Sequence, residues 1–427
     1  MHADRLTEQV LQADCSDDEL TALVVDLVNI RSEAGYEDDV ARYLRDQMAE
    51  RGFRTALQEV EEGRNNVLGV LDTGRPGPSL MFMGHMDTST YHHVDGPPGM
   101  RSEAMVKDGW VYGLGVSNMK SAFAGYLAAT DMLRSSWSEL GGRILIAGVV
   151  GETERAPVGQ WSGRRFRGGG IGAQYMASHG GLADYCINGE PTGLKLQRGN
   201  AGYMFVEVRF VGSAQHAFSK ASAIDPLPRA IRAYERLQAW GEEYSSRHQD
   251  DVMRPLVNVG AVHGGEPFKP SRTAESCSLY MNLNFVRGQT AMAVERELSE
   301  ALHALFADDP AARFEINVFL AKPPHLLEET SPLVRAMGEG HQKVFGTPIP
   351  EVSPPRYSVS SDNPIFAQYG VQAIQYGAGG INLSGGITVN EPGLGEVLGI
   401  ENLASCARVY AVAAAQLLGG QGTADAR

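Results

Sequence analysis

Cysteine is scarce in this chain of 427 residues. The four cysteines lie far apart and include no C-x-x-C pair, which argues against a disulfide framework or a structural zinc site. No run of about 18 consecutive apolar residues occurs, as a transmembrane helix would need, and the first twenty residues lack the apolar segment of a secretory signal. These absences predict a cytoplasmic protein with free thiols and no membrane partner.

Positive charge is also in deficit. Lysine and arginine number 37 against 51 aspartates and glutamates, which gives a formal net charge of −14. An excess of acidic residues gives the chain no overall positive surface to contact a phosphate backbone, which argues against nucleic acid as a partner. A small-molecule substrate stays open, because the overall charge of a protein does not fix the charge of one pocket.

Two kinds of pattern divide the chain. In its first part, continuous apolar runs such as 144–150 alternate with helical periodicity such as 119–134, which is typical of a mixed, largely parallel sheet covered by helices. From about residue 199 the half-buried strand pattern at 204–210 opens the order β-α-β-β-α-β, a ferredoxin-like arrangement. After it the α/β pattern resumes, with a strand at 371–376.

The length and this change of pattern predict two domains. We expect a discontinuous catalytic domain of residues 1–198 and 312–427, with residues 199–311 inserted as a lid or dimerisation domain. The strand pattern at 313–319 completes the β-α-β-β-α-β order.

Chemically capable side chains follow the predicted strands of the larger domain. His85 and Asp87 come after one strand, Glu152 after another and Glu190 after a third. Ligands of open α/β sheets bind at the carboxyl ends of the strands, so this edge is the expected site. A histidine two residues before an aspartate can ligate a metal while the carboxylate orients its ring.

Several motifs occur in a fixed order along the chain. They read G-H-M-D-T (84–88), G-L-G-V-S-N-M-K (113–120), G-E-T-E (151–154), N-G-E-P-T (188–192) and G-S-A-Q-H (212–216). Together they resemble the metal-dependent aminoacylases, carboxypeptidases and deacylases related to acetylornithine deacetylase and succinyl-diaminopimelate desuccinylase. The resemblance covers nearly the whole chain, including the inserted lid.

Typical members of that family hold two metal ions, which share an aspartate in the motif G-x-G-x-x-D-M-K. The resemblance implies that His85 and Glu190 are ligands of the first ion and that Glu152 is the general base. The spacing of the two residues predicts Asp87 beside His85 as the carboxylate that orients it.

This sequence departs from the family pattern on the side of the second ion. The bridging position is Asn118, Thr153 stands in place of a carboxylate, and Ile387 stands in place of a histidine. An apolar side chain cannot ligate, and a hydroxyl or amide oxygen ligates weakly. We therefore expect one divalent ion per chain, zinc or manganese with iron also possible, held by His85, Asn118 and Glu190. The alternative is a shifted alignment in which Glu154 ligates a second ion.

His216 matches a family histidine that reaches the site of the partner subunit. The resemblance therefore implies a homodimer joined through the lid, with His216 supporting developing negative charge. His92 and His93 follow the G-H-M-D-T loop and are weaker candidates for substrate contact.

The position at which many relatives carry a substrate-binding arginine is Asn284. An amide cannot replace a bidentate guanidinium clamp, so we expect a substrate other than a standard N-acyl amino acid. Whether Arg272 or Arg287 substitutes is open at this point.

The predicted function is metal-dependent hydrolysis of a C–N bond in a small molecule, with Glu152 accepting the proton of water. An amide is the substrate that the family implies. One alternative is an aminohydrolase that releases ammonia from an activated, anthranilate-like aromatic amine. Another is an inactive relative that only binds. Retention of His85, Asp87, Glu152 and Glu190 disfavours the inactive relative, because a buried base without a function would be costly to keep.

Overall fold

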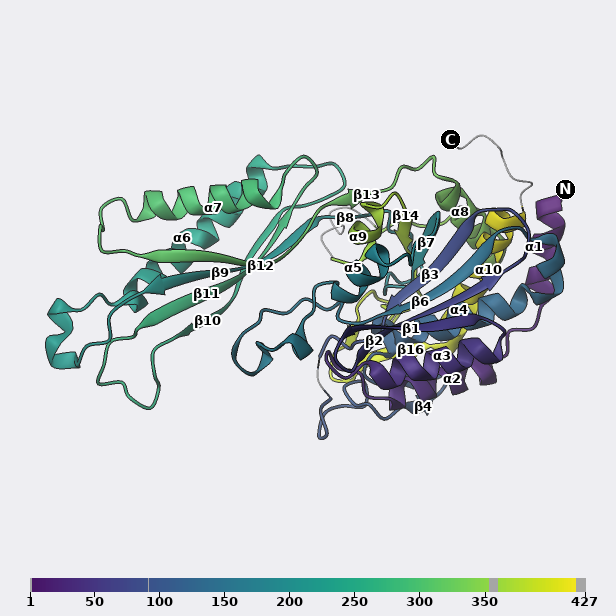
Figure 1. Ribbon diagram of the computed structural model, residues 1–427, viewed down its shortest axis with the longest axis horizontal. Helices are drawn as coiled ribbons and strands as arrows, with labels where there is room; N and C mark the ends of the chain where they lie inside the picture. The colour runs from purple at the N-terminus through teal and green to yellow at the C-terminus, as the bar shows by residue number, and fades with distance from the viewer. Residues whose placement is uncertain (1, 91, 353–359, 420–427) are drawn as a thin grey trace.

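The computed structural model describes residues 2–90, 92–352 and 360–419. Figure 1 shows two lobes, a larger one that contains both described ends of the chain and an elongated one to its side. The larger lobe is built on a six-stranded sheet of order β1-β2-β6-β3-β7-β14. Its strands are β1 (Arg54–Glu61), β2 (Arg64–Asp72), β3 (Ser79–His85), β6 (Arg143–Val149), β7 (Tyr185–Asn188) and β14 (Gln372–Gln375).

This sheet is mixed and largely parallel, as the sequence predicted. Strands β6, β3, β7 and β14 run parallel to one another, and β1 and β2 add two antiparallel pairings at one edge. The carboxyl ends of the four parallel strands therefore meet at one edge of the sheet. The sequence analysis missed β1, whose half-exposed alternation is weaker than the apolar runs of the central strands.

Helices cover both faces of the sheet, which explains why β3 is buried along its whole length. Leu80 and Phe82 of β3 pack into the core formed with α2 (Asp17–Asn29), α3 (Asp38–Glu50), α4 (Ser121–Met132), α8 (Pro332–Phe345) and α10 (Ile400–Gly419). The alternate residues Met81 and Met83 pack against α5 (Ile171–Ser178) and α9 (Asn363–Ala367). A strand buried on both faces is apolar at every position, not at every second one.

The remaining elements of this lobe are short or lie at its margin. They are α1 (His2–Gln12), the irregular turn η1 (Val116–Lys120), the 3-10 helices η2 (Arg134–Glu139), η3 (Gly159–Trp161) and η4 (Arg164–Phe166), β13 (His325–Leu326) paired with β8 (Gly199–Asn200), and a small sheet of β4 (Met105–Lys107), β5 (Trp110–Tyr112), β15 (Asn390–Glu391) and β16 (Gly395–Gly399). Within the described ranges no helix has the length and apolar character needed to cross a membrane.

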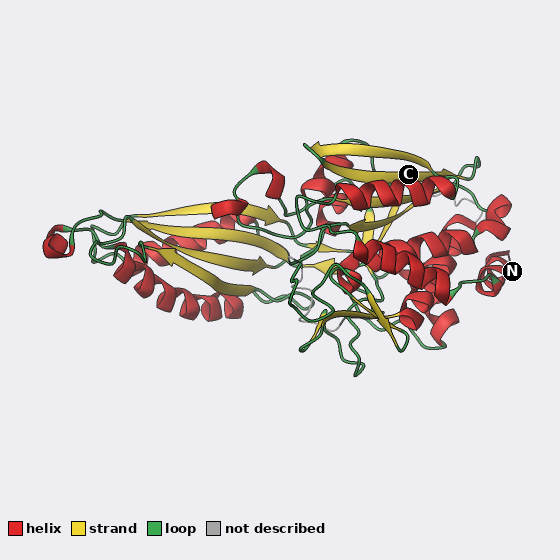
Figure 2. Cartoon of the chain, turned by 90° about the horizontal axis from the view of Figure 1, so that it is seen from below, coloured by secondary structure: helices red, strands yellow, loops and turns green. Residues whose placement is uncertain are grey.

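The elongated lobe follows the predicted β-α-β-β-α-β order. Its elements are β9 (Gly202–Val211), α6 (Pro226–Arg247), β10 (Leu256–Gly264), β11 (Ser276–Phe285), α7 (Ala291–Leu305) and β12 (Phe314–Lys322). The sheet order is β10-β11-β9-β12 with every pair antiparallel, and both helices pack on one face (Figure 2). Because β12 pairs with β9, this sheet extends beyond residue 311, where the sequence analysis ended the insertion.

Candidate active site

His85 is the last residue of β3, and its ring is almost fully buried. Its Nδ1 lies 2.8 Å from the backbone carbonyl oxygen of Asp87. A carbonyl oxygen only accepts hydrogen bonds, so Nδ1 carries the proton and donates it. Nε2 is thereby directed into the site, 2.9 Å from Oδ1 of Asn118 and 4.0 Å from Oε2 of Glu190. This is the ring orientation that a metal-ligating histidine requires.

Asp87 fixes the loop that carries Glu152. Its two carboxylate oxygens accept hydrogen bonds from the backbone amides of Glu152, at 3.0 Å, and Thr153, at 3.1 Å. The turn also requires Gly151, which has a φ of +60° and would place a Cβ 2.6 Å from the carbonyl oxygen of Arg167. Asp87 therefore connects the His85 loop to the Glu152 loop. The backbone amide of Thr153 thus helps to hold the carboxylate of Asp87 in place. The His85 ring is oriented by the backbone carbonyl of Asp87 and not, as the sequence analysis expected, by its carboxylate, since the nearest carboxylate oxygen is 3.7 Å from Nδ1.

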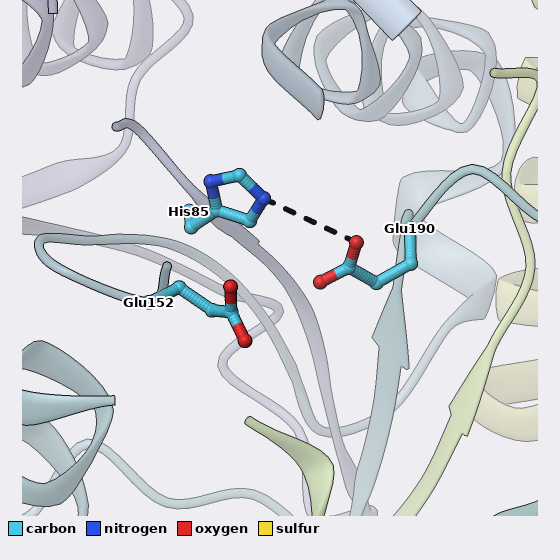
Figure 3. Close-up of side chains that lie close together, drawn as sticks. All are labelled: His85, Glu152 and Glu190. Atoms are coloured by element: carbon cyan, nitrogen blue, oxygen red, sulfur yellow. Dashed lines mark ion pairs between the residues drawn. The ribbon is translucent and has the colours of Figure 1, made fainter. Parts of the chain in front are cut away.

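Glu190 follows β7, the strand beside β3. One nitrogen or oxygen atom each of His85, Glu152 and Glu190 lies within 4.8 Å of the other two. In Figure 3 the Glu152 and Glu190 carboxylates and the His85 ring converge, with the His85–Glu190 ion pair dashed. The three residues come from the carboxyl ends of the adjacent strands β6, β3 and β7, which is the edge that the sequence analysis predicted.

Asn118 lies in η1, a turn that is held from the far end of the chain. The carboxylate of Glu396, in β16, accepts hydrogen bonds from the backbone amides of Ser117 and Asn118 at 3.0 and 2.9 Å. These contacts leave the Asn118 side-chain oxygen beside Nε2 of His85.

The donor set fits a divalent metal ion. Nε2 of His85 and Oδ1 of Asn118 are hydrogen-bonded at 2.9 Å, which is also close to the separation of about 3 Å or a little more between two atoms that each ligate one ion at about 2.1 Å. Glu190 supplies a carboxylate on the same side. A mixed nitrogen and oxygen set is compatible with zinc, manganese and iron and does not select among them.

The pKa values of the site residues reflect crowded carboxylates. Burial lowers the pKa of His85, but the charges of Glu190, Asp87 and Glu152 outweigh it and raise the pKa to about 10. Burial raises the pKa of Glu190 to about 7 against the opposing charge of His85. Burial also raises the pKa of Glu152 well above its usual value, although Lys322 opposes this shift.

These pKa values predict that metal binding strengthens as the pH rises. A ligating His85 must lose the proton that it holds up to a pKa of about 10, and Glu190 must lose its own near pH 7. Between pH 7 and pH 9 one proton should therefore leave per ion bound, and the affinity should rise about tenfold per pH unit. Titration with a competing chelator at pH 7, 8 and 9 measures this slope. A pH-independent affinity over this range would contradict the raised pKa of His85.

Two residues in the site were missed by the sequence analysis. The ammonium group of Lys322, at the end of β12, lies 3.2 Å from Oε1 of Glu152 and 3.4 Å from Oδ1 of Asp362. Oε1 of Glu154 is 3.9 Å from the same ammonium. Lys322 and Asp362 have no motif of their own in the sequence and become visible only through these contacts.

A cavity of about 350 Å³ opens beside the site, between the two lobes. The set of residues that line it includes Asn118, Glu152, Glu154 and Glu190, the amide side chains of Gln197, Asn282, Asn284 and Gln375, and the ring of Tyr203. No arginine or lysine is among the described residues that line it. Asn284 thus occupies the cavity wall, as its alignment with the family arginine predicted, and presents an amide there.

The other residues that the sequence analysis considered for substrate contact lie outside the cavity or pair with other groups of the chain. Arg287 is paired with Asp250 and Asp251. Nδ1 of His92 accepts a hydrogen bond from the backbone amide of Ser102, and His93 is exposed. None of these lines the cavity.

His216 and Ile387 are also outside the described lining of the cavity. His216 is exposed beyond the far end of β9, where its ring stacks on Phe218 and its backbone bridges to Arg272. Ile387 is 41% exposed and lies near Gly193. The structure of one chain does not bring His216 or Arg272 to the site of that chain.

The fold and site define a two-lobed α/β protein with a candidate metal centre at the carboxyl edge of its sheet. The model of peptidase family M20/M25/M40 matches residues 81–416, and the chain belongs to this family. The predicted family is confirmed.

Curated relatives include acetylornithine deacetylase from Aliivibrio fischeri, 26% identical over 264 residues that cover 61% of this chain and 64% of that enzyme. The match thus spans less than two thirds of the relative. The acetylornithine deacetylase of Aliivibrio salmonicida is 26% identical over 67% of this chain and 72% of its own length.

Solved structures share the fold over almost the whole chain. A dipeptidase from Saccharomyces cerevisiae superposes with a TM-score of 0.75 at 11% identity, covering 98% of this chain and 99% of its own. A metallo-carboxypeptidase of the M20 family from Sulfolobus solfataricus gives a TM-score of 0.71 at 17% identity, covering 94% and 99%. A dinuclear metal-binding M20 peptidase from Bacillus subtilis gives 0.63 at 14% identity, covering 94% and 98%.

Proposed function

We propose that this protein is a metal-dependent hydrolase that cleaves an amide-type C–N bond of a small molecule. The observation that carries the proposal is the convergence of His85, Glu152 and Glu190 within 4.8 Å at the carboxyl edge of the sheet. Family membership supports it, since deacetylases and peptidases among the similar proteins act on the same class of bond.

In this proposal His85, Asn118 and Glu190 hold one divalent ion, and Asp87 orients the first of them. The ion lowers the pKa of water and polarises the substrate carbonyl when it is bound. Glu152 accepts a proton from water and delivers it to the departing nitrogen.

The lining of the cavity bears on the substrate. Amide and hydroxyl groups of Gln197, Asn282, Asn284 and Tyr203 face it, without a cation among its described lining residues. Such a wall recognises neutral polar groups by hydrogen bonds, and its described residues present no cation to a substrate carboxylate. We infer a substrate whose recognised groups are uncharged.

A homodimer joined through the lid is part of the proposal. Strand β10 forms one edge of the four-stranded sheet, and Leu256 and Val262 on it are exposed. Leu227, Ile231 and Tyr234 form an exposed apolar stripe at helical spacing on the adjacent helix α6. An exposed strand edge beside an apolar stripe is a surface that a second copy of the chain could cover.

Product analysis tests the function. Metal-loaded enzyme is expected to release a carboxylic acid from members of a panel of neutral N-acyl amines, and a chelator should abolish the release. Ammonia formed from anthranilate-like amines, without any amide cleavage, would replace the proposal by the aminohydrolase reaction. No turnover on either panel, despite bound metal, would favour a protein that only binds.

A further inference from the structure

One buried ammonium group lies among three carboxylates beside the candidate metal ligands. Lys322 Nζ is 3.2 Å from Glu152, 3.4 Å from Asp362 and 3.9 Å from Glu154, measured to the nearest carboxylate oxygen given for each. The side chain of Lys322 is 1% exposed and that of Asp362 is 0% exposed. Removing a lysine so completely from water is costly unless opposite charges surround it.

The carboxylates outnumber the cation. Within the described residues, Oδ2 of Asp362 and Oε1 of Glu154 are buried and have no hydrogen-bond partner. Three converging carboxylates, with buried oxygens left over, form an oxygen-rich donor set of the kind that divalent ions take. The cluster therefore has the donors of a metal site, with an ammonium group at its centre.

We propose that Lys322 serves as the second cation of this active site. Its ammonium group occupies the place between Glu152, Glu154 and Asp362 that a second divalent ion would otherwise fill, and it positions Glu152 toward the His85 side. The inference rests on the proposed function for the first ion.

A lysine differs from a metal ion in where it is anchored. Lys322 ends β12, the strand by which the chain returns from the elongated lobe to the sheet of the larger lobe, and it pairs with Tyr203 of β9. The second cation is therefore part of the connection between the lobes, and it cannot dissociate or be removed by a chelator.

Metal content tests this assignment without any need for a substrate. The full chain is saturated with manganese(II), freed of excess by gel filtration, and analysed for manganese per chain by mass spectrometry. Wild type should retain about one ion. Lys322→Ala removes the charge, leaves space for an ion and its water, and should retain about two. Exchange coupling between two manganese ions should also appear in its electron paramagnetic resonance spectrum.

Matched variants locate the second ion. Lys322→Arg keeps the positive charge and should retain one ion. Lys322→Ala combined with Asp362→Asn loses a donor of the new site and should return to one. Should Lys322→Ala not fold, Lys322→Gln provides the neutral side chain with most of the volume preserved.

The outcomes separate the two proposals. One ion in wild type and still one in a folded neutral Lys322 variant would overturn the role of Lys322. Two ions in wild type would overturn it as well, because the ammonium group would then not stand in for a second ion. No bound ion in wild type would instead reject the proposed function.

Discussion

Glu152→Gln is expected to lower turnover by about 10² to 10⁴ while the metal ion stays bound. Glutamine keeps the shape of the side chain, and its carbonyl oxygen can still accept a hydrogen bond from Lys322, which lies 3.2 Å from Oε1 of Glu152. It cannot accept a proton from water. Steady-state rates on the amide panel, together with metal content, measure the effect.

The matched control for this variant is Glu154→Gln. Glu154 faces the same ammonium group at 3.9 Å but is outside the group formed by His85, Glu152 and Glu190. Its replacement should change turnover by less than about tenfold, since proton transfer stays with Glu152. Full activity in Glu152→Gln and loss of activity in Glu154→Gln would assign the base to Glu154 and shift the alignment of G-E-T-E by two residues.

His216→Ala is expected to lower turnover by about 10² to 10³ without loss of metal, if His216 completes the site of the partner subunit. In the structure its ring is exposed beyond the end of β9, stacked on Phe218, and outside the described lining of the chain's own cavity. Loss of one positioned donor to developing negative charge accounts for the size of the effect. His303→Ala, an exposed histidine of α7 in the same lobe, is the control and should leave turnover unchanged.

Mixing His216→Ala with Glu152→Gln sharpens the test. After complete subunit exchange half of the dimers are mixed, and each mixed dimer holds one site with Glu152 from one chain and His216 from the other. About a quarter of wild-type activity should return. Exchange shown by mass, without recovery of activity, would rule out a role for His216 in the partner's site.

The sequence by itself determined the fold class and the place of the chemistry. The apolar run at 144–150 reads as a strand buried on both faces, and the motif residues at the ends of three such strands had to meet because parallel strands end at one edge. The departures from the family's metal-ligand motifs at Asn118, Thr153 and Ile387 could likewise be recognised from the sequence alone. The local sequence pattern is enough to predict the position of a site residue when that residue directly follows a strand that the same pattern reveals.

Only the tertiary structure revealed which distant side chains share the site. Arg287 is taken up by an ion pair with Asp250, 37 residues away. Lys322 reaches Glu152 and Asp362 only through the return of β12 from the inserted lobe. In sequence a lysine at the end of a half-exposed strand reads as a surface residue, because a buried charge is normally too costly to expect. Its burial depends on carboxylates supplied from other parts of the chain, and no local pattern can show that they converge.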